Sequence, residues 1–289
     1  YEETLRNDHL FDNNLKYVNI KSKIKEYFDI TYSHSKESDI ILKQMTWKRL
    51  FLKCYFEFYI EYFKDLAEFK ELHRMLDIMK DDIIHLNILI SQTGNLKSDY
   101  YYLKLILSAF TNLKCLNIIY KDETNIKIFK ELFKGINNFT EAGGCLEHLS
   151  IKTYGSPNSK IEDYTLLTIM NKLPHLKSVT LHDLKLDDSC IVNLRNSLYY
   201  FKTIQVLDLS YCNLVDKDAK ELADGLMKAK NLEKIILQGN KFNTGLSDIL
   251  YNISFIPNLK VVDISNSNPK NIMTSLYKLI KIGRASCRE

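Results

Sequence analysis

The sequence predicts an α/β solenoid, in which short parallel strands alternate with helices and each unit stacks on the one before it. Two observations carry this prediction. Apolar residues recur at positions 1, 4 and 6 of a short segment, and the starts of successive segments lie 27 to 33 residues apart. In the best-defined units, the segment is followed by apolar residues at helical spacing.

The segments with the strand pattern are distributed evenly along the chain. They begin at Ile83, Leu113, Leu146, Leu176, Ile204, Leu232 and Leu259. The intervals are 30, 33, 30, 28, 28 and 27 residues, which random clustering of apolar residues rarely produces. The longer second interval predicts an insertion at or before Gly143 and Gly144. We therefore expect six to seven repeats over residues 81–281, and such a stack needs no other core.

The composition agrees with a helix-rich repeat protein. Of the 289 residues, 45% are hydrophobic, only 9 are Gly and 4 are Pro. This scarcity of turn residues argues against a β-sandwich or barrel, and the apolar content argues against disorder. The net charge of +4 arises from interspersed residues of both signs, so we expect no nucleic-acid partner. No stretch approaches 18 consecutive apolar residues, and we expect no membrane partner.

Each unit is expected to begin with a strand and to continue into a helix. In the unit that starts at Ile204, positions 4 and 6 are Leu207 and Leu209, which alternate with polar neighbours as a half-buried strand requires. A helix with Asp216 and Asp218 near its start follows. Its apolar face consists of Ala219, Leu222, Ala223 and Leu226. The next unit repeats this spacing with Leu246, Ile249, Leu250 and Ile253.

Position 9 follows the end of the strand and holds Cys212 or Asn240 in the two clearest units. A side chain with hydrogen-bonding capacity at this turn can satisfy backbone groups, and the apolar residue at position 11 then re-enters the core. Other units have Lys121, Tyr154, Leu184 and Ser267 at position 9. The ladder of polar side chains is therefore expected to be incomplete toward both ends.

These repeats resemble leucine-rich repeat proteins of the ribonuclease-inhibitor-like class. The pattern that carries the resemblance is Ile204-x-x-Leu207-x-Leu209-x-x-Cys212-x-Leu214. Residues 232–242 repeat it, and the resemblance covers residues 83–281. It implies a horseshoe with a parallel sheet on the concave face and a full helix per repeat on the convex face.

Side chains at positions 3, 5, 7 and 8 are expected to point away from the core and to form columns across the stack. Their chemistry is mixed, with tyrosines among charged and amide side chains, which suits a protein partner. The predicted partner-binding residues are Tyr120, His148, Lys152, His182, Asp183, Asp208, Tyr211, Lys234, Gln238 and Asp263. A polar face that is merely solvated is the alternative interpretation.

The sequence contains no recognised catalytic or metal-binding motif, so we expect neither an enzyme nor a cofactor or metal. Strings typical of nucleotide binding, serine hydrolases and zinc proteases are missing. Cys145 and His148 form the only close Cys–His pair, whereas a structural zinc needs four ligands. His148 and His182 lie on neighbouring predicted strands, but no nucleophile accompanies them. Asp187 and Asp188 are better placed to begin a helix.

Neither end of the sequence carries the repeat. Residues 1–80 are rich in Lys, Tyr and Phe, and an aromatic helical face from Trp47 to Tyr62 predicts a helical N-terminal cap over the open edge of the array. The chain begins at Tyr1 without an initiator methionine, so we expect a preceding segment to be missing. Residues 282–289 resemble the translation of a sequencing adapter and are interpreted as a non-native tail.

Five cysteines precede that tail, an odd number without a CxxC pair. They are Cys54, Cys115, Cys145, Cys190 and Cys212. Such a pattern is typical of buried, reduced thiols and not of a disulfide framework. We therefore expect an intracellular protein, either cytoplasmic or cytoskeletal.

The N-terminal region supports two further resemblances, and the repeats support a third. Residues 30–61, together with the repeat class, are similar to the leucine-rich subunit of the nexin–dynein regulatory complex of motile cilia, which implies a non-enzymatic scaffold on the axonemal doublet. Trp47-Lys48-Arg49-Leu50 also resembles the end of an F-box motif, which implies a ubiquitin-ligase substrate adaptor, although the upstream Leu-Pro is missing. The repeats alone resemble those of Ran GTPase-activating proteins. A protein-binding scaffold of the axoneme is the preferred interpretation.

Overall fold

The computed structural model describes residues 76–77, 79–90, 101–120, 126–153, 160–161 and 172–267. The chain divides into two compact units, residues 1–63 and 64–289, and every described residue belongs to the second. The predicted tail, the segment from Trp47 to Tyr62 and nearly all of the predicted cap lie outside the described residues. The repeat array is the part of the chain that the structure describes.

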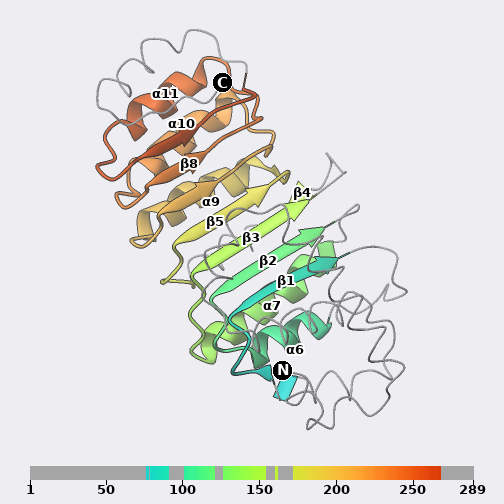
Figure 1. Cartoon of the computed structure of the whole chain (residues 1–289). Helices are drawn as coiled ribbons and strands as arrows, with labels where there is room; N and C mark the ends of the chain where they lie inside the picture. Colours follow the sequence, from blue (N-terminus) through green and yellow to red (C-terminus); the bar gives the residue numbers. More distant parts are fainter. Residues whose placement is uncertain are drawn as a thin grey trace, which may run out of the picture. The chain divides into compact units, whose positions relative to one another are not determined.

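Seven parallel strands form one sheet whose order follows the sequence (Figure 1). They are β1 (His85–Ile90), β2 (Cys115–Tyr120), β3 (His148–Thr153), β5 (Ser178–His182), β7 (Val206–Asp208), β8 (Lys234–Ile236) and β9 (Val261–Asp263). Each inner strand pairs with the strands of the preceding and following repeats. The α/β solenoid predicted from the repeat pattern is therefore confirmed for this part of the chain.

The described helices of the array lie on one side of this sheet (Figure 1). They are α6 (Tyr101–Ala109), α7 (Ile126–Glu141), α9 (Asp188–Tyr200), α10 (Asp216–Leu226) and α11 (Gly245–Ile253). Helix α7 has 16 residues, and its length accommodates residues of the long second interval before Gly143. The short strands β4 (Lys160–Ile161) and β6 (Lys185–Leu186) form a separate two-stranded sheet.

The core lies between the sheet and the helices, and its residues occupy the predicted positions. Leu207 pairs in register with Val179 on one side and Ile235 on the other. The position-4 side chains are buried in all seven strands, and they are Leu86, Leu116, Leu149, Val179, Leu207, Ile235 and Val262. The predicted apolar faces of α10 and α11 are buried as well. One hydrophobic layer therefore runs through the whole stack.

Position 2, just before strands β2, β3, β5, β7, β8 and β9, forms a column of mostly charged side chains. Its members are Lys114, Glu147, Lys177, Gln205, Glu233 and Lys260. Glu147 Oε2 lies 2.6 Å from Lys177 Nζ, and this hydrogen bond holds the pKa of Glu147 below its ordinary value. Glu233 and Lys260 form an equivalent pair at 2.6 Å. Such exposed pairs contribute only about 0–1 kcal/mol each, but they favour the observed order of the strands.

The polar ladder at position 9 is longer than the sequence predicts. Cys212, Asn240 and Ser267 each donate a side-chain hydrogen bond to the position-6 carbonyl of the preceding repeat, at 3.0, 2.8 and 3.5 Å respectively. Ser267 therefore continues the ladder instead of ending it, because its hydroxyl reaches the same carbonyl. Leu184, which is buried and apolar, has no side-chain donor to offer at this position.

Asn240 makes the most complete set of these contacts. Its side-chain Nδ2 donates to the carbonyls of Leu209 and Leu237 at 2.8 and 2.9 Å, and its Oδ1 accepts from the backbone N–H of Leu214 at 3.0 Å. The residue is 3% exposed, so water cannot replace these bonds. One amide thus joins the turns of two adjacent repeats.

Acidic side chains cap α9 and α11. Asp187 caps α9 as predicted, whereas Asp216 caps the helix of the following repeat and not α10, near whose start the sequence predicts it to act. Asp187 accepts a hydrogen bond from the backbone N–H of Cys190 at the start of α9. Asp216 accepts from the backbone N–H groups of Asn243, Thr244 and Gly245 in the following repeat, and these bonds lower the pKa of its carboxyl. The cap of α11 therefore comes from the neighbouring repeat.

Leu207→Ala removes a fully buried side chain from the middle of the sheet. We expect the free energy of unfolding to fall by about 2–5 kcal/mol, because a cavity between stacked strands cannot close fully. Urea denaturation of the whole chain measures this loss. Lys220→Ala, an exposed change on α10, is the control and should have an effect below about 0.5 kcal/mol. A loss below about 1 kcal/mol for Leu207→Ala would contradict the strand register.

Asn240→Ala leaves one N–H and two carbonyls without their buried partner. Since each such group costs about 1–3 kcal/mol, we expect the free energy of unfolding to fall by about 3 kcal/mol or more. Asn240→Cys, which copies the equivalent residue Cys212, should cost clearly less, because the thiol can still donate to the Leu209 carbonyl. Equal losses for the two variants in urea denaturation would count against the ladder.

Candidate partner-binding site

The candidate site is the side of the main sheet that faces away from the helices, called here the sheet face. Along β3 the burial alternates strictly between half-exposed and buried side chains. The pairing places Lys152 beside His182, and it aligns Asp208 with Thr180 and Ile236. The predicted columns at positions 3 and 5 are therefore confirmed, because the strands pair in the expected register.

The predicted site residues all belong to this face or to the turns at the ends of its strands. Nine of them keep part of their surface exposed to solvent, and they are His148, Lys152, His182, Asp183, Asp208, Tyr211, Lys234, Gln238 and Asp263. Tyr120 ends strand β2 and pairs with Thr153; the structure describes its backbone but not its side chain. The strand geometry thus brings these residues onto one continuous surface.

A cluster around Tyr211 forms the centre of this surface. The rings of His182 and Tyr211 meet edge to face with their centroids 5.3 Å apart. Asn266 donates a hydrogen bond from Nδ2 to the Tyr211 hydroxyl at 3.1 Å. The sequence does not single out Asn266, although it occupies position 8 two repeats after Tyr211. Three repeats therefore contribute to one small group of side chains.

Position 8 lies after the end of each of the later strands and adopts a left-handed conformation. The φ values of Asp183, Tyr211, Gly239 and Asn266 are 57°, 58°, 70° and 55°. The first three residues each donate a backbone hydrogen bond to the position-7 carbonyl of the next repeat, at 3.0, 2.8 and 2.9 Å. A Cβ on Gly239 would lie 2.3 Å from the Tyr211 ring. Glycine at this position therefore leaves the space in which the tyrosine ring lies.

Two of the predicted carboxylates also stabilise the turns. Asp208 Oδ1 accepts hydrogen bonds from the backbone N–H of Ser210 at 2.9 Å and from its hydroxyl. Asp263 makes the same pair of bonds with Ser265, at 3.0 and 2.7 Å. These bonds orient the carboxylates while leaving them partly exposed, so a partner would meet fixed charges.

The expectation that the side chains at positions 3, 5, 7 and 8 all lie exposed on this face is wrong at four described places from β2 onward. Cys115, Thr180, Ser210 and Thr153 are buried, at 5%, 7%, 2% and 1% exposure. Ser210 turns back to Asp208, and the hydroxyl of Thr153 donates to the backbone carbonyl of Asp183. Short hydroxyl side chains are covered in this way because they bond to nearby groups.

The electrostatic environment of His182 combines burial with opposing charges. Burial lowers the pKa of the imidazole, Lys152 lowers it further, and Asp208 partly opposes this shift. The neighbouring Asp183 has a raised pKa because its carboxyl is partly desolvated. The cluster thus favours a neutral His182 near pH 7.

The structure places the two histidines considered for acid–base catalysis, His148 and His182, apart from each other. His148 begins β3 and His182 ends β5, and Lys152 is the residue paired with His182. Four residues of strand, or about 13 Å, therefore separate the two imidazoles along the sheet. Among the described residues, no group of three or more His, Cys, Asp or Glu side chains could hold a metal ion.

Within the same residues, no helix is both long and apolar enough to cross a membrane.

The described cysteines agree with the prediction of buried free thiols, with one exception. Cys115, Cys190 and Cys212 are buried, and burial strongly raises the pKa of the Cys212 thiol. Cys145 is only half-buried, because it follows the turn after α7 at Gly143. Cys54 lies outside the described residues.

A buried polar group at the first two strands is not among the predicted site residues. Asn117 Nδ2 donates to Asn87 Oδ1 at 2.8 Å and lies 3.0 Å from His85 Nε2. His85 and Asn87 are 1% and 7% exposed. The signal in the sequence is the repetition of asparagine at position 5 of two consecutive repeats. This group ties β1 to β2 through side chains as well as through the backbone.

The comparisons with known proteins concern the fold alone. No protein-family model and no curated protein matches the chain. The assignment of an α/β solenoid rests on the strand order and register of the chain itself. One similar solved structure is a TLR13–ssRNA13 complex, with 14% identity, a TM-score of 0.38, and coverage of 72% of this chain and 33% of that chain. Another is an internalin (inlF) from Listeria monocytogenes, with 13% identity, a TM-score of 0.23, and coverage of 78% and 96%. The chain thus spans about a third of the TLR13 chain.

The pKa of His182 should lie below 6.5 and move in opposite directions in two variants. Asp208→Asn removes the carboxylate that favours the imidazolium, so the pKa falls further. Lys152→Met removes a like charge, so the pKa rises. NMR titration of the imidazole measures both shifts, with Lys220→Met as a control that should leave the pKa unchanged. Shifts of the same sign in the two variants would contradict this arrangement of charges.

Proposed function

We propose that this chain is a non-catalytic scaffold that binds another protein across its sheet face. The observation that carries the proposal is the row of partly exposed, chemically mixed side chains that successive repeats contribute to this face. Lys152, His182, Tyr211 and Asp263 supply charge, aromatic area and hydrogen-bonding groups within a few strands of one another. Such a combination is typical of protein interfaces.

The rigidity of these side chains supports the same proposal. Asp208 and Asp263 are held by two hydrogen bonds each, and the Tyr211 ring is fixed between His182 and Asn266. Side chains that are already ordered lose less conformational entropy when a partner binds. A surface of this kind can therefore bind a partner without first rearranging.

In its more specific form, the proposal is a linker-complex subunit on the axoneme of motile cilia, with other subunits of that linker as partners. The similarity of residues 30–61 to the leucine-rich subunit of the nexin–dynein regulatory complex supports it, and that segment lies outside the described residues. The F-box interpretation rests on Trp47–Leu50 alone, and the interpretation as a Ran GTPase-activating protein rests on the repeat class alone. The axonemal scaffold is therefore preferred.

Expression of the tagged 289-residue chain in ciliated cells tests both levels of the proposal. We expect the wild-type chain to stay with salt-extracted axonemes, and the Lys152→Glu/Lys234→Glu variant to be retained at least tenfold less, because it reverses two charges on the sheet face. Lys220→Glu/Lys241→Glu makes the same change of charge at exposed positions outside that face and should behave as wild type. Quantitative immunoblotting of the axonemal pellet measures retention.

The possible outcomes separate the two levels. A wild-type chain found wholly in the cytosol contradicts the axonemal role. Equal retention of the sheet-face variant and wild type contradicts binding through the sheet face. Co-purification of a Skp1-like subunit with the chain would favour the ubiquitin-ligase adaptor, and acceleration of GTP hydrolysis by Ran in a single-turnover assay would favour the GTPase-activating protein.

A further inference from the structure

The ends of helices α9 and α11 carry exposed apolar side chains away from the sheet face, and the half-buried Met227 lies at the end of α10 between them. Tyr199 and Tyr200 are 62% and 68% exposed, and Tyr251 and Phe255 are 49% and 54% exposed. Together with Met227 they form the surface named here the helix-end patch. Large contiguous apolar surfaces that remain in contact with water are commonly binding sites.

The helix-end patch follows the repeat of the chain. Tyr199, Met227 and Phe255 are successively 28 residues apart and occupy the same position in three consecutive repeats. Helix α10 packs against both α9 and α11 (Figure 1), so these three side chains form a row across the C-terminal ends of the helices. Packed helices have axes about 8–10 Å apart, and the row therefore offers anchors at about that spacing.

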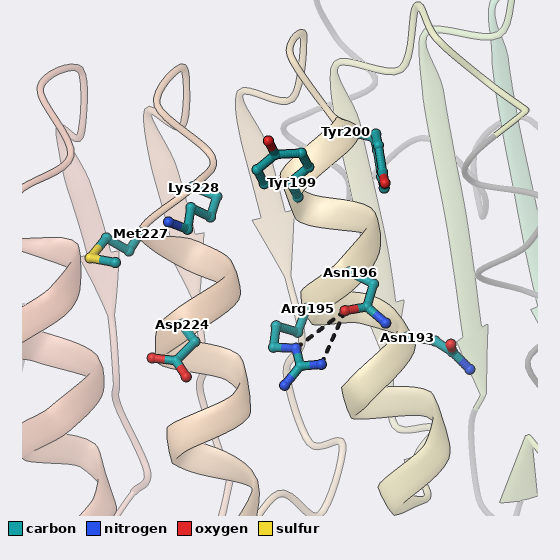
Figure 2. Close-up of a pocket in the computed structure, with 8 residues that line it drawn as sticks. All are labelled: Asn193, Arg195, Asn196, Tyr199, Tyr200, Asp224, Met227 and Lys228. Carbon is teal, nitrogen blue, oxygen red and sulfur yellow. Dashed lines mark hydrogen bonds between the residues drawn. The ribbon is translucent and has the colours of Figure 1, made fainter.

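Polar groups line the space between the first two helices of the patch. Figure 2 shows this open groove, to which Asn193, Arg195 and Asn196 contribute from α9 and Asp224 contributes from α10. Arg195 donates to Asn196 Oδ1 at 3.3 and 3.1 Å and forms an ion pair with Glu221. The groove therefore offers amide groups for hydrogen bonds next to an apolar row, and tyrosine, methionine and arginine are enriched at protein interfaces.

The charge beside the apolar row is predominantly positive. Lys202, Lys228 and Lys230 are exposed at the same ends of α9 and α10. Glu221 compensates the charge of Arg195, and Asp224 is the one carboxylate in the lining of the groove. A partner with apolar anchors and acidic flanks therefore complements this surface.

The shape of the patch favours a helix over a nucleic acid. The rings of Tyr199 and Tyr200 meet at 84°, and those of Tyr251 and Phe255 meet at 80°, so neither pair forms parallel platforms for successive bases. Asp224 would also oppose phosphate groups. An α-helix presents the same face every seven residues, or about 10.5 Å, which is close to the spacing of the row.

We propose that the helix-end patch binds an acidic amphipathic helix of a partner protein. Apolar residues seven positions apart on that helix contact the row of Tyr199, Met227 and Phe255, and its carboxylates face the three lysines. The patch uses none of the residues of the sheet face, so this interaction is independent of the function proposed above.

Fluorescence anisotropy with a designed peptide tests the proposal on the whole chain. The probe is a labelled helical peptide of about 21 residues, built from seven-residue repeats with leucine at the first and fourth positions of each repeat. Glutamates occupy the positions on either side of this leucine face. A peptide of the same composition with leucines five residues apart is the control. We expect the control peptide to bind at least tenfold more weakly, because its leucines do not share one helical face.

Matched variants identify the surface that the peptide uses. Tyr199→Ser/Phe255→Ser should raise the Kd at least tenfold, whereas Tyr211→Asn, which removes an aromatic ring from the sheet face and copies Asn266, should leave it unchanged. Lys228→Glu should weaken binding severalfold at low salt and less at high salt. Lys220→Glu makes the same charge change elsewhere on α10 and is the control. Circular dichroism and the urea midpoint verify that each variant folds.

Four outcomes would overturn the proposal. The peptide does not bind, or the Tyr199→Ser/Phe255→Ser variant binds it as well as wild type does. A single-stranded oligonucleotide or an anionic lipid vesicle binds in place of the peptide, with the same dependence on these variants. Sedimentation shows self-association of the chain that the variant abolishes, which would make a second copy the occupant.

Discussion

Stacking of the strands in one common register is the constraint on which the rest of the array depends. A single repeat cannot bury Leu207, because the strands on both sides of β7 complete its surroundings. Backbone bonds secure this register at both ends of the strands: the Lys177 carbonyl accepts from Gln205 and Val206 at the start, and Tyr211 donates to Gln238 at the end. Any change that disturbs one repeat therefore weakens its contacts with both neighbours.

The same register creates surfaces on both layers of the molecule. On the sheet it aligns side chains such as Lys152 and His182, and at the helix ends it aligns Tyr199 with Met227 and Phe255. Each surface is thus a column of equivalent positions that can vary in chemistry without changing the backbone. The core positions are restricted to apolar residues, whereas the column positions are free to match a partner.

The sequence predicts the columns well because apolar periodicity determines both the buried face and the pairing of strands. It does not predict where each strand ends. Strands β1 to β3 have six residues but β7 to β9 have three. In the later repeats position 8 is left-handed at residues such as Tyr211, a residue type with no marked preference for that conformation. The hydrogen bond of Ser267 depends on a local turn. The helix-end patch emerges only when Tyr199 and Phe255 are aligned by repeat, since 56 residues separate them in sequence.

The charged column at position 2 means that loss of one repeat has different electrostatic consequences from loss of another. Gln205 is the neutral member of that column, between Lys177 and Glu233. Removal of residues 204–231 would bring Lys177 next to Glu233 and join opposite charges. Removal of the repeat that contains Glu147 would instead bring Lys114 next to Lys177, which have the same charge. A recombination event that shortens this solenoid is therefore best accommodated at the repeat that carries Gln205.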